Sequence, residues 1–149
     1  IMLQQALKKE LSRVDKGYVL LFLIPTLVVF AYGKYRCDYI TKYKDILEFG
    51  LFYNSNKYGI DGWSITHFSL FLLIGYFYSK TFILTMTLGL LWELFETYVG
   101  VYKPNLIKGL GFCQLSSNRY KVWWYGKWSD PIFNLLGFLT GSYINKYIK

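Results

Sequence analysis

The chain has 149 residues, of which 54% are hydrophobic, and many of these stand in long apolar runs. A chain of this length forms one domain, and apolar runs of this length exclude an ordinary soluble globular protein. The 17 Lys and Arg residues exceed the 9 Asp and Glu residues, but they are spread over termini and loops without forming a basic stripe. The sequence therefore predicts no nucleic-acid partner and favours anionic phospholipid head groups as the counter-charge.

The first half of the chain predicts one surface helix and one membrane span. Residues 1–16 place leucines at helical spacing with lysines between them, which is typical of an amphipathic helix on a membrane surface. Residues 17–33 carry no charge and, at about 1.5 Å per residue, cross most of a ~30 Å hydrocarbon core. Residues 34–62 are more polar and predict a loop, with a short helix over residues 40–51.

The second half predicts three further spans. Residues 64–78 and 81–99 are apolar and are joined by a tight turn, which forces an antiparallel helical hairpin. Residues 100–127 form a second loop, and residues 129–148 form the last apolar segment. We therefore expect a single domain over residues 1–149, an all-α polytopic membrane protein with about four transmembrane helices and both loops on the same side.

The cysteines and the tryptophans fall in or beside the two predicted loops. Cys37 and Cys113 are too few for a disulfide framework; two free thiols are favoured, and one bridge between them is the alternative. The charges of the loops and termini do not decide the orientation of the chain. Five tryptophans fall on the side of the two loops, as an interfacial aromatic belt would; they are Trp63, Trp92, Trp123, Trp124 and Trp128.

Ionisable residues inside the apolar segments define the candidate site, because they are costly at membrane depth. His67, the only histidine, and Glu93 lie equally far from Lys80 on the two arms of the hairpin, so they share one depth. Glu96 lies three residues beyond Glu93 on the same helix face. Asp130 opens the last segment from the same side, so residues of three helices are expected in one layer.

This layer predicts a site for acid–base and metal chemistry. Carboxylates that lie close together repel unless they are protonated or bridged by a cation, and oxygen ligands suit Ca²⁺ or Mg²⁺. Glu93, Glu96 and Asp130 are the candidate metal ligands, and Asn134, one turn after Asp130, adds a carboxamide. His67 is the candidate general base, because its ordinary pKa lies near 6.5. With His67, the three carboxylates form the candidate catalytic set for phosphoester chemistry at a lipid head group.

Each of these residues also has a structural explanation. His67 has a possible role in capping the start of the second apolar segment. Glu93 and Glu96 fit interfacial residues that pair with Lys103, and Asp130 fits an N-cap of the last helix. Asn134 fits a hydrogen bond between helices.

The order of motifs resembles the eukaryotic base-exchange phosphatidylserine synthase family over about residues 62–143. The motifs are His67-Phe68, Trp92-Glu93-Leu94-Phe95-Glu96, Trp123-Trp124, Asp130, and Asn134 with Gly137 and Gly141. The spacing of the two glycines also allows close helix approach in a membrane. A weaker resemblance, to VanZ-like membrane proteins, rests on the membrane His-Phe pair and the late Asp-x-x-x-Asn followed by glycines.

The first resemblance implies a calcium-dependent exchange in which L-serine replaces choline or ethanolamine on a phospholipid. It implies His67 as base or nucleophile, and Glu93, Glu96 and Asp130 as ligands of calcium or the head group. Asn134 would then be a supporting polar residue. The resemblance to VanZ-like proteins specifies no reaction.

Two hypotheses of function follow. The first is a phosphatidylserine-synthase-like transferase of phospholipid head groups. The alternative is a non-catalytic structural or accessory subunit of a large organellar complex or viral particle, because abundant Lys, Tyr, Phe and Ile beside only two alanines, Ala6 and Ala31, is typical of an AT-rich genome. Both place the chain in a mitochondrial, endoplasmic-reticulum or viral membrane, as a homo-oligomer or with other subunits.

Overall fold

A computed structural model of the protein describes residues 2–39, 45, 47, 50, 60–116, 119–124 and 126–148. Most of the predicted short helix over residues 40–51 lies outside the described residues. The described chain forms α1 (Met2–Leu11), α2 (Lys16–Tyr39), α3 (Gly62–Phe77), α4 (Phe82–Tyr102), a 3₁₀ turn (Asn105–Ile107), β1 (Phe112–Ser116), β2 (Arg119–Val122) and α5 (Ser129–Ile148).

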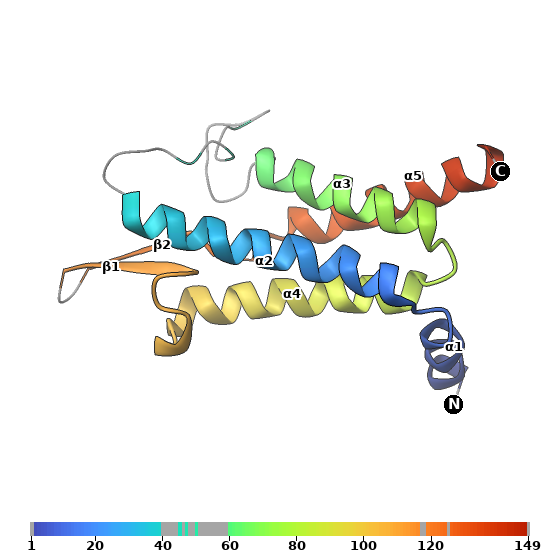
Figure 1. The fold of residues 1–149 in the computed structure, drawn as a ribbon, viewed down its shortest axis with the longest axis horizontal. Coiled ribbons are helices and arrows are strands. Elements are labelled where there is room, and N and C mark those ends of the chain that lie inside the picture. Colours follow the sequence, from blue (N-terminus) through green and yellow to red (C-terminus); the bar gives the residue numbers. More distant parts are fainter. Residues whose placement is uncertain are drawn as a thin grey trace.

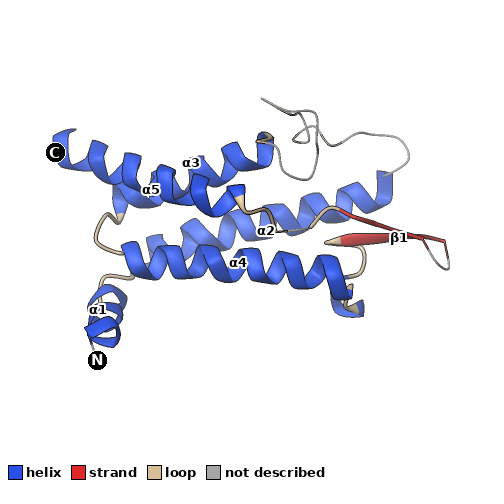
Figure 2. Cartoon of the chain, turned by 180° about the vertical axis from the view of Figure 1, so that it is seen from behind, coloured by secondary structure: helices blue, strands red, loops and turns tan. Residues whose placement is uncertain are grey.

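The four long helices run along the length of the molecule, with α1 at one end and the β1–β2 hairpin at the other (Figures 1 and 2). The two chain ends that the figures mark lie at the α1 end. Glu10 fastens α1 to this end, because its carboxylate accepts hydrogen bonds from the backbone N–H groups of Ile83 (3.2 Å) and Leu84 (2.7 Å). These two groups open α4 and would otherwise have no partner.

Helices α3 and α5 form the closest pair, and they run parallel. A Cβ atom on Gly137 would overlap the carbonyl oxygen of Phe68, and one on Gly141 would overlap that of Leu72. Further along, the Asn145 carboxamide donates to the Tyr76 carbonyl. The expected close approach at the two glycines is therefore confirmed, and it brings the backbones of α3 and α5 into contact.

The connection between α3 and α4 is as short as predicted. Helix α3 ends at Phe77 with Tyr78 as its C-cap, and the next helix begins at Phe82. Helix α2 lies antiparallel to α3, because Tyr18 packs on Tyr78 at one end and Tyr32 packs on Trp63 at the other. Helix α3 therefore runs antiparallel both to α2 and, through the short turn, to α4.

The prediction of an all-α protein with four transmembrane helices is wrong. Among the described residues, two helices, α2 and α4, are long and apolar enough to cross a membrane. Helix α3 has 16 residues, a length of about 24 Å against a hydrocarbon core of ~30 Å. Helix α5 has 20 residues but carries Asp130, Asn134 and Lys146. In addition, the predicted loop over residues 100–127 contains an antiparallel β-hairpin.

A disulfide joins Cys37 to Cys113, so the favoured prediction of two free thiols is wrong. Helix α2 continues past residue 33, where the first span was expected to end, to Tyr39. Cys37 is therefore helical, and Cys113 lies in β1. Their Cα atoms are 5.4 Å apart, a separation that a disulfide spans. The bond ties the end of α2 to the hairpin.

Polar side chains occupy much of the interior, while apolar side chains cover the outside. Thr85 and Asn134 are among the most buried side chains of the described chain. The outer faces of α2, α4 and α5 expose large aliphatic side chains, which include Leu23, Ile24, Leu27, Val28, Leu90, Leu91, Leu94, Leu136 and Leu139. Exposed apolar surface on this scale marks contact with a membrane or with another protein.

Candidate functional site

A small cavity of about 30 Å³ lies between the helices near the hairpin, with room for about two water molecules. Its wall is formed by side chains of all four long helices and of the segment that follows β2: Val29, Trp63, His67, Glu96, Trp123, Trp124, Lys127 and Asp130. Its aromatic walls and converging ionisable groups are typical of ligand sites, but clefts that hold drug-sized ligands measure about 300–1,000 Å³, so this pocket has the size of a site for an ion and water. We call it the pocket below.

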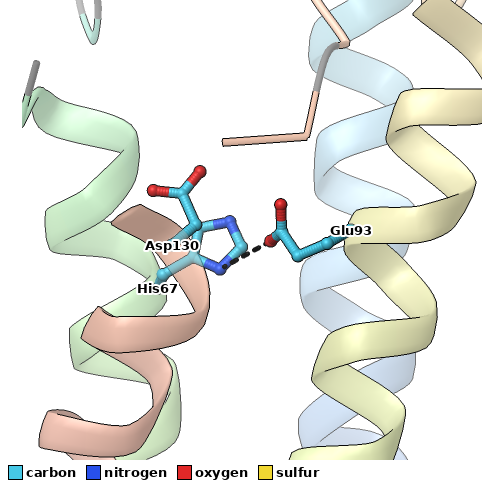
Figure 3. A group of neighbouring side chains, drawn as sticks. All are labelled: His67, Glu93 and Asp130. Atoms are coloured by element: carbon cyan, nitrogen blue, oxygen red, sulfur yellow. Dashed lines mark ion pairs between the residues drawn. The ribbon is translucent and has the colours of Figure 1, made fainter. Parts of the chain in front are cut away.

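Three ionisable side chains from three helices meet beside the pocket (Figure 3). One ligand atom each of His67, Glu93 and Asp130 lie within 4.8 Å of one another. Nδ1 of His67 is 3.7 Å from a carboxylate oxygen of Glu93. The proximity that the spacing around Lys80 predicted for His67 and Glu93 is therefore confirmed, whereas their chemical roles stay predictions.

Asn134 determines which nitrogen of the His67 ring carries the proton. Its side-chain oxygen lies 3.0 Å from Nδ1 of His67 and is 67 residues away in sequence. Because a carboxamide oxygen accepts hydrogen bonds and cannot donate them, Nδ1 carries a proton. Nε2 of a neutral His67 ring is then the nitrogen that can take a proton or bind a cation. His67 does not cap its own helix, contrary to the structural alternative.

Asp130, at the start of α5, accepts hydrogen bonds from two serine hydroxyl groups. Ser64 donates to its Oδ1 at 2.9 Å, and Ser129 donates to the same atom at 3.4 Å. Asp130 is 3% exposed, so its carboxylate is fixed inside the protein. Because Ser64 belongs to the first turn of α3, this contact also joins the starts of α3 and α5.

Glu93 is the most unusual member of the group. It is 7% exposed, and neither of its carboxylate oxygens has a hydrogen bond of normal geometry among the described residues. The polar groups that face it are Nδ1 of His67, 3.7 Å away, and the backbone N–H and side chain of Lys127. A buried carboxylate without a partner is costly unless it carries a proton or binds a cation. The backbone is crowded at the same place, because a Cβ atom on Gly126 would lie 2.6 Å from the Glu93 carbonyl oxygen. Gly126 thus lets the segment before α5 pass directly over α4.

Glu96 lies apart from this group. Its carboxylate accepts a hydrogen bond from Trp92 Nε1 at 2.9 Å, and the side chain forms part of the pocket wall. The alternative explanation, a pairing with Lys103, is not seen among the described residues; the Lys103 ammonium donates to the Val101 carbonyl at 3.3 Å. Of the predicted metal ligands, the structure thus brings Glu93 and Asp130 together with His67 and leaves Glu96 on the wall.

Sequence reasoning missed a buried ion pair beside the pocket. Lys127 and Asp61 are both 7% exposed, and the ammonium of Lys127 donates to Oδ2 of Asp61. The other oxygen of Asp61 accepts from the backbone N–H of Ser64 at 3.2 Å, which makes Asp61 the N-cap of α3. An aspartate before an apolar helix is a readable capping signal, but nothing in the sequence indicates Lys127 as its partner.

A second missed cluster holds the aromatic wall. Arg36 of α2 forms a buried ion pair with Asp45, which also accepts hydrogen bonds from Tyr32 (2.6 Å) and Trp63 (3.1 Å). The guanidinium of Arg36 lies 4.9 Å from the ring centre of Trp123. This contact has the geometry of a cation–π interaction. The cluster therefore fixes two of the three tryptophans of the pocket.

Removal of Asp61 should destabilise the protein, because Lys127 would stay buried without its carboxylate and α3 would lose its cap. We expect Asp61→Ala to lower the free energy of unfolding by about 3 kcal/mol, measured by denaturation in detergent. The matched control is Asp38→Ala, which removes the exposed pair with Lys34 and should cost less than about 1 kcal/mol. Equal losses in the two variants would contradict a structural role for the buried pair.

Comparison with known proteins found no relative that would assign a role to the site. No protein-family model matches the chain, and no curated protein or solved structure is significantly similar to it.

Proposed function

We propose that the protein is a membrane enzyme that exchanges head groups on phospholipids and uses a divalent cation held by Glu93 and Asp130. One observation carries the proposal. The buried carboxylate of Glu93 lacks a hydrogen-bond partner among the described residues and stands within 4.8 Å of ligand atoms of both Asp130 and His67. This arrangement suits a cation site, in which a divalent cation would be the partner of Glu93 in place of a positively charged His67 ring.

The residues fit a divalent cation by charge and by atom type. The two carboxylates supply two negative charges and oxygen ligands, which suit Ca²⁺ and Mg²⁺. Direct binding by the imidazole of His67 would instead favour Mn²⁺ or Zn²⁺. A bound cation would polarise a phosphodiester oxygen and stabilise the charge that develops on it.

His67 then provides the proton transfer. Nε2 takes the hydroxyl proton of the incoming amino alcohol while the hydroxyl oxygen forms a bond to phosphorus. The phosphorus–oxygen bond to the old head group breaks, and the proton passes from His67 to the alcohol that leaves. Asn134 keeps the ring oriented through its hydrogen bond to Nδ1. The resemblance of the motif order to the phosphatidylserine synthase family supports this choice of reaction.

The surface of the molecule supports a membrane location. Helices α2 and α4 are long and apolar enough to cross a bilayer, and their outer faces expose aliphatic side chains such as Leu27 and Leu94. Trp128, which is 64% exposed, is placed as a tryptophan at a lipid–water boundary would be, whereas Trp123 and Trp124 are buried in the core. Glu96 of the pocket wall lies six residues, about 9 Å, inside the end of α4 at Tyr102, so a head group would reach below that boundary to meet the pocket.

An exchange assay tests the proposal. The full chain in phosphatidylcholine liposomes with labelled L-serine should form labelled phosphatidylserine and release choline when Ca²⁺, Mg²⁺ or Mn²⁺ is present. We expect His67→Ala to lower the rate by at least about a hundredfold, because a general base contributes that much or more. Trp128→Phe is the control, since Trp128 is 64% exposed and does not line the pocket.

The absence of exchange with every cation would overturn the proposal, as would a His67→Ala variant with wild-type activity. Co-purification with other membrane proteins in fixed ratio, together with no cation binding, would identify the accessory subunit instead.

A further inference from the structure

We propose that the pocket holds a water molecule bound to Nε1 of Trp123, and that this water is a second acceptor of the phosphatidyl group, so that the protein also hydrolyses phospholipids. The products of this further reaction are phosphatidic acid and the free head-group alcohol. The reaction rests on the proposed function, because it uses the same cation site and the same base. The water site rests on separate observations of Trp123 and of the pocket.

Trp123 carries a buried donor without a partner. Its side chain is 9% exposed and lines the pocket, and its Nε1 has no hydrogen bond among the described residues. A buried indole N–H usually has a partner, which is an ordered water where the protein supplies none. The guanidinium of Arg36 lies 4.9 Å from the centre of the ring and helps to hold its orientation. The unpaired N–H is therefore a fixed feature that calls for an acceptor oxygen.

The pocket fits water in size and in polarity. Its volume of about 30 Å³ exceeds the roughly 10–15 Å³ that one buried water needs. A buried water makes about three hydrogen bonds. Besides the indole N–H, the lining offers acceptors for the protons of the water, namely the carboxyl groups of Glu96 and Asp130 and the imidazole of His67. The water can thus accept from Trp123 and donate to two of these groups.

The charges around the pocket favour a neutral oxygen over an anion beside Trp123. An anion would meet the carboxylate of Asp130, which lies in the same lining. Lys127 also lines the pocket, but its ammonium is already paired with Asp61. Water or a hydroxyl group is the ligand that satisfies the indole N–H without this repulsion.

Water in this place can replace the amino alcohol in the reaction. Its oxygen forms a bond to phosphorus while Nε2 of His67 takes one of its protons. The phosphorus–oxygen bond to the head group breaks, and the proton passes to the alcohol that leaves, so no further reactant is needed. An enzyme that avoids hydrolysis has to exclude water from its site. Here the polar lining stabilises water, and a pocket of this volume takes only the hydroxyl end of an amino alcohol.

Labelled water tests the hydrolysis. The full chain in phosphatidylcholine liposomes with Ca²⁺, Mg²⁺ or Mn²⁺, in water enriched in heavy oxygen and without added alcohol, should release choline and form phosphatidic acid with one heavy oxygen in its phosphate. Addition of L-serine should lower the yield of phosphatidic acid, because the two acceptors compete for one site. Exchange without hydrolysis would overturn this inference and leave the proposed function standing. Hydrolysis without exchange would do the reverse, and neither product would overturn both.

Trp123→Phe removes the donor and keeps an aromatic ring beside Arg36. We expect the rate of hydrolysis to fall about fivefold, the effect of one net hydrogen bond. Exchange should fall less, because serine has further polar groups by which it can bind, so the ratio of the two products should change. A variant that is merely destabilised would lower both rates equally, and that result would overturn the role of Trp123. Trp128→Phe is again the control.

The water site has a readout that needs no catalysis. In the chain with ¹⁵N-labelled tryptophan, the indole N–H signal of Trp123, assigned by its loss in Trp123→Phe, should show a nuclear Overhauser effect to a long-lived water. Val29→Leu adds a methylene to the pocket wall and should weaken this effect, whereas the same change at Val28, which is 60% exposed, should not. An indole N–H without such an effect in the wild type would overturn the water site, whatever the outcome of the exchange assay.

Discussion

Replacement of Glu93 by glutamine is expected to weaken divalent-cation binding by at least about a hundredfold. Loss of a residue that merely supports a metal ligand costs ten- to a hundredfold in affinity, so loss of a direct ligand should reach the upper end or beyond. Titration of the purified chain with Mn²⁺, followed by electron paramagnetic resonance, measures the change.

The matched control for this variant is Glu96→Gln. Glu96 lies one turn from Glu93 on the same helix, but its carboxylate is already bonded to Trp92 and is not one of the three converging groups. We expect less than about a tenfold change, as for a residue outside the ligand set. Similar losses in both variants would show that the compact group is not the binding site.

Glu93→Gln should weaken cation binding but should not lower the stability of the cation-free protein. Without cation, the variant should be at least as stable as the wild type, because it removes a buried carboxylate that lacks a hydrogen-bond partner. With cation, only the wild type should gain stability. Thermal denaturation with and without a chelator separates these effects, and a variant destabilised under both conditions would indicate a structural role for Glu93.

Replacement of Gly141 by leucine is expected to separate α3 from α5 and to lower the free energy of unfolding by at least about 3 kcal/mol, the upper end of overpacking costs. A Cβ atom at this position would overlap the Leu72 carbonyl oxygen and lie 2.7 Å from the Tyr76 nitrogen, and neither backbone group can move aside. Denaturation in detergent measures the loss.

Gly141→Leu should also disrupt the site that α3 and α5 form together. His67 lies on α3 and Asn134 on α5, so a wider spacing breaks the hydrogen bond that orients the ring. The control is Leu139→Ala on the outer face of α5, where Leu139 is 50% exposed, so this variant should lose less stability than Gly141→Leu. Wild-type stability of Gly141→Leu would contradict the close packing of α3 on α5.

The depth of the site was predictable because it depends on simple helical rise. His67 and Glu93 lie equally far from the turn at Lys80, and a short connection forces their helices to run antiparallel. Asp61 could also have been recognised as a helix cap. These features depend on neighbours in sequence or on one tight turn, which a single chain reveals.

The other features depend on helix rotation and on partners distant in sequence. Spacing puts Glu93 and Glu96 on one face, and the rotation of α4 decides that Glu93 meets His67. The contact of Glu96 with Trp92 is local, because the two residues are four apart on α4. Lys127 finds Asp61 across 66 residues. Four apolar runs predict four spans, but α3 is too short and α5 too polar to qualify as a membrane span.

The parallel packing of α3 on α5 has an electrostatic consequence. Both helices begin beside the pocket, so the positive ends of two helix dipoles, each equivalent to about half an elementary charge, point toward the same place. Their first turns hold Ser64 and Asp130, which are hydrogen-bonded to each other. The dipole of α5 also stabilises the negative charge of the Asp130 carboxylate, which lies in its first turn. The glycines that bring the two helices together thus also shape the electric field of the pocket.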